Sequence, residues 1–243
     1  MANEKKYNIK RVSVVIPAKD EEAKLGHVLD DLNHALIESK RDFEIIVVND
    51  NSRDRTKEIA LGKGIRVIDN RGRPGKGNAL RLGFKECTGD VLAMLDADYS
   101  HRPEDLPLFL DRIEQGDGMV IGSRIWGGSE EYTRVRAFGN IMLTTIFGLI
   151  FHRYLSDVLN GYKVFRRDIF DNFKYSSSTF EIEIELAVNT LRCGYKIMEV
   201  SSHERERAGG KAKSRVVLHG IKFLLKIITE GIKFHYFKRV RIR

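Results

Sequence analysis

Val91-Leu92-Ala93-Met94-Leu95-Asp96-Ala97-Asp98 decides the fold, because five apolar residues run directly into two carboxylates. A short, continuously apolar run predicts a strand that is buried on both faces. Asp96 and Asp98 would then lie at the end of a core strand, on the same side of an extended segment. Two neighbouring carboxylates at the edge of a core are unfavourable unless they are neutralised. A hard divalent cation would neutralise them; an acidic loop that caps the next helix is the alternative.

Apolar runs on either side of this strand alternate with helical patterns. We expect strands at 12–16, 43–48, 65–68, 90–95 and 119–121, and helices at 20–39, 53–60, 75–85 and 103–115. Pro17 is expected to end the first strand. This alternation predicts an α/β fold with a mostly parallel, Rossmann-like sheet and helices on both faces. Ligands of such sheets bind at the carboxyl ends of strands, where Asp50 and Asp96 stand.

The second half of the chain is less regular. We expect a loop over 122–136, a helix over 137–154, a strand over 160–165, a helix over 180–192, a strand over 195–200 and a charged loop over 203–215. An amphipathic helix follows over 216–236. The expected organisation is one domain over 1–215. A C-terminal helix and basic tail over 216–243 would pack on that domain or lie at a membrane surface.

Composition limits the class of protein. The chain has 243 residues, of which 42% are hydrophobic and 31% charged, which argues against disorder. Its net charge of +8 favours anionic partners. The two cysteines, Cys87 and Cys193, form no CxxC motif, which is typical of a reducing compartment. The segment 1–10 lacks the apolar core of a signal peptide, and the most apolar stretch, 141–151, is too short to span a bilayer.

Two further segments carry candidate binding residues. Asp50 follows an apolar strand, and its carboxylate could accept hydrogen bonds from a base or a ribose; Ser52 or Asp54 could cap the next helix. The segment 71–79 is rich in glycine and basic residues and opens a helix, which suits an anion. A flexible basic turn is the alternative. It is not a Walker A loop, since neither Ser nor Thr follows Lys76.

Taken together, and in their order along the chain, these segments resemble the sequence pattern of glycosyltransferase family 2, which implies a GT-A fold. The run 96–106, with its Asp-Ala-Asp-x-Ser-His-x-Pro-Glu pattern, is similar to the branch of polyprenyl-phosphate (dolichyl-phosphate) mannose synthases. Gly122-Ser123-Arg124 and the segments 157–167 and 199–213 are similar to further motifs of that branch. The chain departs from the pattern at four positions, which are Asn49, Asn51, Asn160 and Ala212.

The resemblance implies a donor and a set of site residues. The donor would be a nucleoside-diphosphate sugar, GDP-mannose by the branch, with UDP-glucose or UDP-N-acetylglucosamine as alternatives. The residues implied for nucleotide-sugar binding are Pro17, Ala18, Asp20, Glu22, Asp50, Lys76 and Asp96. The metal, Mg²⁺ or Mn²⁺, would be held by Asp96, Asp98 and Ser100. The catalytic group would be Asp98 with the phosphate-clamping residues Arg124, Arg207 and Lys213.

The implied acceptor is a polyprenyl or dolichyl phosphate. A phosphate monoester is largely ionised near neutral pH, because its second pKa is about 6. It therefore needs positioning rather than a strong base, and its attack on the anomeric carbon would invert the configuration. The apolar and basic C-terminal helix suits an anionic membrane interface. We expect a peripheral enzyme at the cytoplasmic face of a membrane, with a possible membrane-anchoring protein partner and without nucleic acid.

Three other interpretations account for part of the sequence. A family 2 enzyme could use a saccharide or a small phosphorylated alcohol as acceptor. A nucleotidyltransferase predicts a glycine-rich loop after the first strand, where Pro17-Ala18-Lys19 stands instead. A non-catalytic membrane scaffold predicts a broken acidic pair, and both Asp96 and Asp98 are present.

Overall fold

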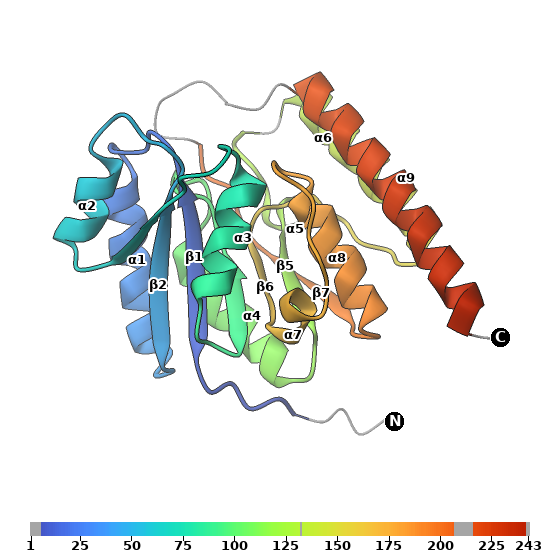
Figure 1. Ribbon diagram of the computed structural model, residues 1–243, viewed down its shortest axis with the longest axis horizontal. Helices are drawn as coiled ribbons and strands as arrows, with labels where there is room; N and C mark the ends of the chain where they lie inside the picture. Colours follow the sequence, from blue (N-terminus) through green and yellow to red (C-terminus); the bar gives the residue numbers. More distant parts are fainter. Residues whose placement is uncertain (1–5, 132, 207–215, 242–243) are drawn as a thin grey trace.

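Residues 6–131, 133–206 and 216–241 are described by a computed structural model. Within them, seven strands form one sheet in the order β3-β2-β1-β4-β6-β5-β7 (Figure 1). The strands are β1 Val12–Ala18, β2 Phe43–Asn49, β3 Arg66–Asp69, β4 Val91–Met94, β5 Met119–Ser123, β6 Lys163–Arg166 and β7 Ile197–Ser201. All neighbouring pairs are parallel except those of β6, which runs antiparallel to β4 and β5. The mostly parallel sheet predicted from the sequence is confirmed.

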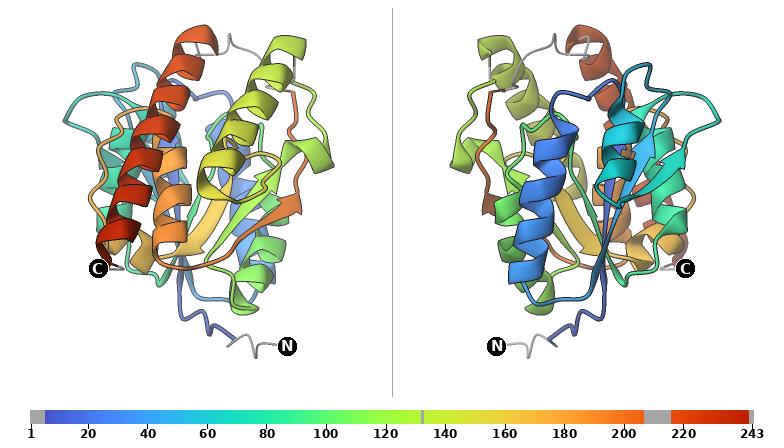
Figure 2. Two further views of the ribbon diagram at one scale, coloured as in Figure 1. Left: turned by 90° about the vertical axis from the view of Figure 1, so that its right-hand side faces the viewer. Right: turned by 90° about the vertical axis from the view of Figure 1, so that its left-hand side faces the viewer.

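Helices cover both faces of this sheet (Figures 1 and 2). They are α1 Leu25–Glu38, α2 Thr56–Gly62, α3 Lys76–Glu86, α4 Leu106–Glu114 after the 3₁₀ turn η1 Pro103–Asp105, α5 Arg124–Gly127, α6 Arg134–Phe151, α7 Asp168–Asp171, α8 Ile182–Arg192 and α9 Val216–Arg241. The alternation of side chains along each strand explains the two layers. Val14 belongs to the cluster with α1 and α4, and Val15 to the cluster with α3, α6 and α8.

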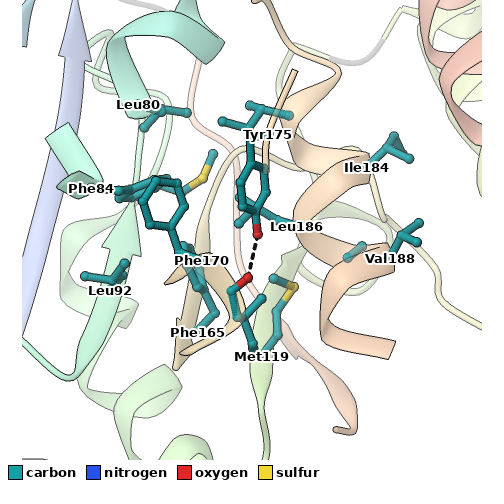
Figure 3. Packing of buried hydrophobic residues seen from close by; sticks show 14 of the residues in the cluster. Leu80, Phe84, Leu92, Met119, Phe165, Phe170, Tyr175, Ile184, Leu186 and Val188 are labelled. Carbon is teal, nitrogen blue, oxygen red and sulfur yellow. Dashed lines mark hydrogen bonds between the residues drawn. The ribbon is translucent and has the colours of Figure 1, made fainter. Parts of the chain in front are cut away.

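Aromatic rings fill the second of these clusters. Figure 3 shows Phe84 of α3 beside Phe165 of β6 and Phe170 of α7, with ring centroids 5.3 and 5.2 Å apart. Tyr175 is buried there too, and its hydroxyl donates to the carbonyl of Ile169 at 2.7 Å. Such edge-to-face packing fixes α3 and α7 against the sheet. This positions the start of α3, which carries Lys76.

The first strand is longer than predicted, because Pro17 does not end it. β1 pairs with β4 only from Val12 to Val15, but it pairs with β2 as far as Ala18. The carbonyl of Ala18 accepts from the amide of Asp50, so Ala18 faces β2 and Pro17 faces the other side. Pairing with β4 has already ended there, so the missing N–H of proline costs no ladder bond.

Three local features were not predicted. β6 was expected as an ordinary strand over 160–165, and its antiparallel direction does not follow from its composition. The expected loop over 122–136 contains α5 and the start of α6, and the short helix α7 was missed. Turns of four residues carry too little periodicity to be recognised.

The described part of α9 packs along α6 and α8 (Figure 2). Ile227 is fully buried there, and Lys226 and Glu230 form ion pairs with Glu185 and Arg192 of α8 at 2.8 and 2.9 Å. α6 has 18 residues and a mean hydropathy of 1.3, so by length and composition alone it could cross a membrane. About a third of it, 33%, is buried, and core helices meet the same criteria. The boundary between 215 and 216 stays a prediction.

Candidate functional site

Three predicted site residues line one cavity at the carboxyl edge of the parallel strands. The cavity measures about 190 Å³, and Lys76, Asp96 and Arg124 contribute to its wall. Lys76 opens α3, Asp96 follows β4, and Arg124 follows β5. Residues from α6, α8 and α9 complete the wall. The other predicted residues of the described chain lie outside this lining.

Lys76 lies between two carboxylates. Its ammonium contacts Asp96 Oδ1 at 2.7 Å and Glu183 Oε1 at 2.9 Å. Burial opposes its protonation, but these two charges and hydrogen bonds outweigh burial and raise the pKa of Lys76 above its usual range. A Cβ at Gly161 would lie 2.7 Å from the ammonium and 3.0 Å from Asp96 Oδ2, so only glycine allows this approach.

The acidic pair does not have the expected extended geometry. β4 ends at Met94, and a turn follows in which Tyr99 has a φ of 64°. Asp98 Oδ1 accepts from the amide of Ser100 at 3.1 Å and from its hydroxyl at 2.6 Å. The extended backbone predicted for this segment is therefore wrong, because Ala97 and Asp98 lie in a turn.

The oxygen atoms at this turn fit a hard divalent cation. Asp96, Asp98 and Ser100 offer carboxylate and hydroxyl oxygens, which are the ligands that Mg²⁺ and Mn²⁺ prefer. Across 6–131, 133–206 and 216–241, no group of three His, Cys, Asp or Glu side chains forms a ready-made metal cluster. Mg²⁺ is usually bound by one or two protein carboxylates together with substrate phosphates.

Arg124 is held by a buried carboxylate. Its Nε and Nη2 donate to the two oxygens of Asp157 at 2.6 and 2.8 Å, and Nη1 lies 3.3 Å from Glu204. Asn140 of α6 donates to Asp157 at 2.7 Å. Burial acts to raise the pKa of Asp157, but Arg124 and these hydrogen bonds hold it below its usual range. The fork geometry fixes the direction of the guanidinium at the cavity wall.

The loops after β1 and β2 are joined to each other. The amide of Arg53 donates to Asp20 at 2.7 Å, and the amide of Arg55 donates to Glu22 at 3.1 Å. Asp20 has a φ of 53°, a conformation that asparagine and aspartate tolerate better than most residues. Pro17 and Ala18 end β1 next to this junction. The two loops therefore form one unit beside the strand ends.

Asp50 makes internal contacts with both of its oxygens. Oδ1 accepts from the amide group of Asn70 at 2.7 Å, and Oδ2 accepts from the backbone N–H of Gly75 at 2.8 Å. Asp50 thereby positions the residue that precedes Lys76. Its predicted contact with a base or ribose stays a prediction.

The glycines around Lys76 are explained by close packing. A Cβ at Gly75, whose φ is 145°, would lie 2.3 Å from the carbonyl of Ser178, and one at Gly77 would lie 2.6 Å from that of Ser177. The amide of Asn78 donates to Ser178 at 3.2 Å. These glycines therefore let the segment 177–179 approach the first turn of α3. Close packing is thus a second explanation for the glycines, besides the anion binding that their composition predicts.

Arg207 and Lys213, predicted to clamp phosphate, lie outside the described residues. The chain just before them lies beside the turn that follows β4, because the amide of Arg205 donates to the carbonyl of Ser100 at 2.9 Å. The Arg205 side chain pairs with Glu104 at 2.6 Å and lies over the ring of Tyr99 at 4.6 Å. The segment that leads to Arg207 therefore starts at the turn that holds Asp98.

Two buried acids of the site were not predicted. Glu183 is 2% exposed and Asp157 is fully buried. A signal for Glu183 exists in the sequence: Glu181, Glu183 and Glu185 alternate with apolar residues, and in a helix such positions point in different directions, so one must face inward. Asp157 opens the segment 157–167, and the resemblance of that segment to a family motif is the signal that could have found it.

Comparison with known proteins identifies the family. The model of glycosyl transferase family 2 matches residues 13–173. The chain belongs to glycosyl transferase family 2. It is therefore an enzyme of the glycosyltransferase class, as predicted. The match covers the strand ends that carry Asp50, Asp96 and Arg124.

Two curated family 2 relatives are similar over most of this chain. The dolichyl-phosphate hexose transferase of Haloferax volcanii is 32% identical over 203 residues, which are 84% of this chain and 86% of that protein. The dolichol-phosphate mannosyltransferase of Pyrococcus furiosus is 29% identical over 229 residues, which are 90% of this chain. The chain spans only 64% of the length of that second relative.

Solved structures share the family 2 fold. Glucosyl-3-phosphoglycerate synthase from Mycobacterium tuberculosis, crystallised with Mn²⁺, uridine diphosphate and glucosyl-3-phosphoglycerate, superposes with a TM-score of 0.73. The alignment covers 91% of this chain and 80% of that one at 21% identity. This likeness confirms the GT-A architecture.

Proposed function

We propose that this enzyme transfers a hexose from a nucleoside-diphosphate sugar to a polyprenyl phosphate, with inversion at the anomeric carbon. The names of the Haloferax and Pyrococcus relatives support the acceptor class. GDP-mannose is the proposed donor; UDP-glucose and UDP-N-acetylglucosamine are the alternatives. The whole enzyme is proposed to work as a peripheral protein at the cytoplasmic face of a membrane.

The composition of the cavity carries this proposal. Its wall combines the apolar residues Val135, Leu143 and Phe223 with three cations and the acids that pair with them. The cations are Lys76, Arg124 and Arg136, and the acids are Asp96, Glu131, Glu183 and Glu204. The apolar residues come from α6 and α9, and the cationic ones come from the strand-end side and the start of α6. The apolar residues suit the isoprenoid chain of a polyprenyl phosphate, and its anionic head would bind to cations that now pair with acids of the wall.

The outer surfaces of α6 and α9 support access to a membrane. Phe138 and Leu149 of α6 are 71% and 66% exposed, and Leu225 and Ile232 of α9 are 57% and 67% exposed. Exposed apolar side chains gathered on adjoining helices mark a membrane or protein interaction surface. Figure 2 shows both helices on one side of the molecule. The proposed partners are a bilayer surface and a membrane-anchoring protein.

The proposed reaction needs no strong base. An oxygen of the ionised lipid phosphate attacks the anomeric carbon, the bond from that carbon to the β-phosphate oxygen breaks, and the nucleoside diphosphate leaves with the electron pair. Arg124 would orient the attacking phosphate, because Asp157 already fixes its guanidinium. Arg207 and Lys213 are proposed to clamp phosphate oxygens beside it.

The proposed donor site is the strand-end edge. Pro17, Ala18, Asp20 and Glu22 would border the nucleotide, with Asp50 and Lys76 beside them. Asp96, Asp98 and Ser100 would hold Mg²⁺ or Mn²⁺, which neutralises the charge that develops on the leaving diphosphate. Mn²⁺ in the mycobacterial neighbour supports a divalent metal in this fold.

A transfer assay tests this function. The protein is incubated with radiolabelled GDP-mannose, UDP-glucose or UDP-N-acetylglucosamine, Mn²⁺ and dolichyl phosphate in detergent, and the mixture is extracted into organic solvent. Label should enter the organic phase with one donor and remain aqueous when unphosphorylated dolichol replaces the acceptor. Label that enters only a water-soluble product, with phosphoglyceric acid as acceptor, would favour a small phosphorylated acceptor. No transfer under any of these conditions would rule the proposal out.

A further inference from the structure

The position of Lys76 suggests a second role for its ammonium. Asp96, a proposed metal ligand, already has a cation at 2.7 Å. A divalent ion that takes Asp96 must therefore displace Lys76 from it or lie close enough to repel it. Lys76 and the metal compete for one carboxylate.

The surroundings of Lys76 determine the direction in which it can move. Glu183 lies 2.9 Å away and is 2% exposed, whereas the Asp96 side chain is 25% exposed. Gly161 closes another side of the ammonium, and the ring of Phe180 lies 5.3 Å from it. Both acids line the cavity, but Asp96 is the more exposed of the two. The contact with Glu183 is more deeply buried and would be costly to break, because it would leave a buried carboxylate without its cation.

We propose that Lys76 is a tethered internal cation, which occupies Asp96 until a divalent metal and the donor diphosphate bind together. Glu183 is the tether and is a positioning residue. When the metal takes Asp96, Lys76 keeps its contact with Glu183 and turns its remaining donors towards the diphosphate. This inference rests on the metal site in the proposed function.

The consequence is coupling between metal and nucleotide. Without a diphosphate, a divalent ion at Asp96 meets the nearby ammonium and binds weakly. With a diphosphate, both cations gain an anionic partner, and each favours binding of the other. Lys76 therefore ensures that the metal is retained only together with the donor.

Binding of Mn²⁺, followed by electron paramagnetic resonance of the free ion, tests this inference without an activity assay. We compare the wild type with Lys76→Gln, whose amide can still donate to Glu183, first with Mn²⁺ alone and then with GDP or UDP added. Lys76→Gln should bind Mn²⁺ alone about tenfold more tightly, and added nucleotide should improve its binding less than it improves that of the wild type. Equal affinity of the two folded proteins for Mn²⁺ alone would overturn the inference.

Two matched variants show whether Mn²⁺ binding depends on the ammonium at Asp96 or on the net charge of the protein. Lys57 of α2 pairs with Asp69 at 2.6 Å. Lys57→Gln removes the same charge as Lys76→Gln, so the Lys57→Gln protein should bind Mn²⁺ as the wild type does. Lys76→Arg keeps the charge and should also bind weakly. If Lys57→Gln tightens binding as much as Lys76→Gln does, net charge alone is responsible and the inference is wrong.

Two further variants keep the test decisive. If Lys76→Gln does not fold, the double variant with Glu183→Gln removes both buried charges and should bind Mn²⁺ alone more tightly than the wild type. Asp96→Asn should abolish Mn²⁺ binding in each background. Binding that survives Asp96→Asn, or no binding by any variant even with nucleotide, would show that the proposed metal site itself is wrong. That result differs from a failure of the competition alone.

Discussion

Arg124 and Asp157 form a two-point ion pair in which the carboxylate is fully buried and the guanidinium is 17% exposed. The pair joins the end of β5 to the segment that leads into β6. Replacement of Arg124 by alanine would leave the Asp157 charge buried without its partner. We expect Arg124→Ala to lower the free energy of unfolding by about 3–5 kcal/mol, measured by urea denaturation.

A surface pair provides the control for this prediction. Arg55 pairs with Glu22 but is 82% exposed, so Arg55→Ala should cost less than about 1 kcal/mol. The double variant Arg124→Ala with Asp157→Asn should recover part of the loss, because it removes the buried charge. Equal costs for the two arginines would contradict the assignment.

The buried Lys163 is expected to make the free energy of unfolding depend on pH. Its side chain is fully buried and donates to the carbonyls of Val158, at 2.9 Å, and Asn160. Burial lowers its pKa from 10.5 to about 8, although the charges of Glu183 and Asp157 act to raise it. Between those two values the unfolded chain holds a proton that the folded chain has released, so this residue favours folding more as pH rises.

The measurement is a comparison with Lys163→Gln across pH. The free energy of unfolding of the wild type, minus that of the variant, should increase from pH 8 to pH 10 by up to about 1.4 kcal/mol per unit. Below pH 8 the difference should be flat. A difference that falls as pH rises would mean that the ammonium is stabilised rather than destabilised by its site.

Asp98 is expected to be essential to the transfer reaction. Asp98→Ala should reduce transfer by at least about 10³-fold if the residue holds the metal at the leaving diphosphate. Ser100→Ala removes a proposed hydroxyl ligand and the 2.6 Å hydrogen bond that orients Asp98, but it keeps both carboxylates. It should therefore cost less and should raise the Mn²⁺ concentration needed for half-maximal rate. Activity of Asp98→Ala close to that of the wild type would reject the metal role.

Gly161→Ala tests how tightly the backbone confines Lys76. The added Cβ would lie 2.7 Å from the ammonium and 3.0 Å from Asp96 Oδ2, so these side chains must shift. We expect the Michaelis constant for the donor to rise at least about fivefold, with little loss of stability. Gly62→Ala at the end of α2 is the control, since Gly62 does not line the cavity and a Cβ there meets no atom within 4 Å. Similar kinetics for both variants would show that the confinement does not affect donor binding.

The apolar surface of α6 and α9 is expected to bind lipid. Phe138→Asp combined with Leu225→Asp should lower binding to vesicles that contain anionic lipid by at least about tenfold in a flotation assay. Ile37→Asp on α1 changes an equally exposed residue, at 59%, outside these helices and should leave binding intact. Equal loss in both proteins would point to a general charge effect.

The sequence predicts the strand-helix alternation and the strand ends with Asp50 and Asp96, because buried parallel strands are continuously apolar. It does not predict that β6 lies between β4 and β5, since register and direction depend on contacts distant in the chain. The ion pairs of Lys76 with Glu183 and of Arg124 with Asp157 follow from that topology, which is why their acidic partners were missed. In the Gly75-Lys76-Gly77 segment, composition alone indicates an anion-binding loop, whereas the structure shows that the glycines allow close packing.

The antiparallel direction of β6 has a consequence for folding. An antiparallel strand begins at the edge where its parallel neighbours end, so the segment before β6 brings Gly161 to Asp96, and α8 then brings Glu183 to Lys76 from 107 positions later in the chain. Contacts of such sequence separation form late, since loop closure costs entropy before they contribute. During synthesis the emerging chain can complete the first three parallel strands well before Glu183 is available. The cation pocket thus closes only after the chain has been made as far as Glu183.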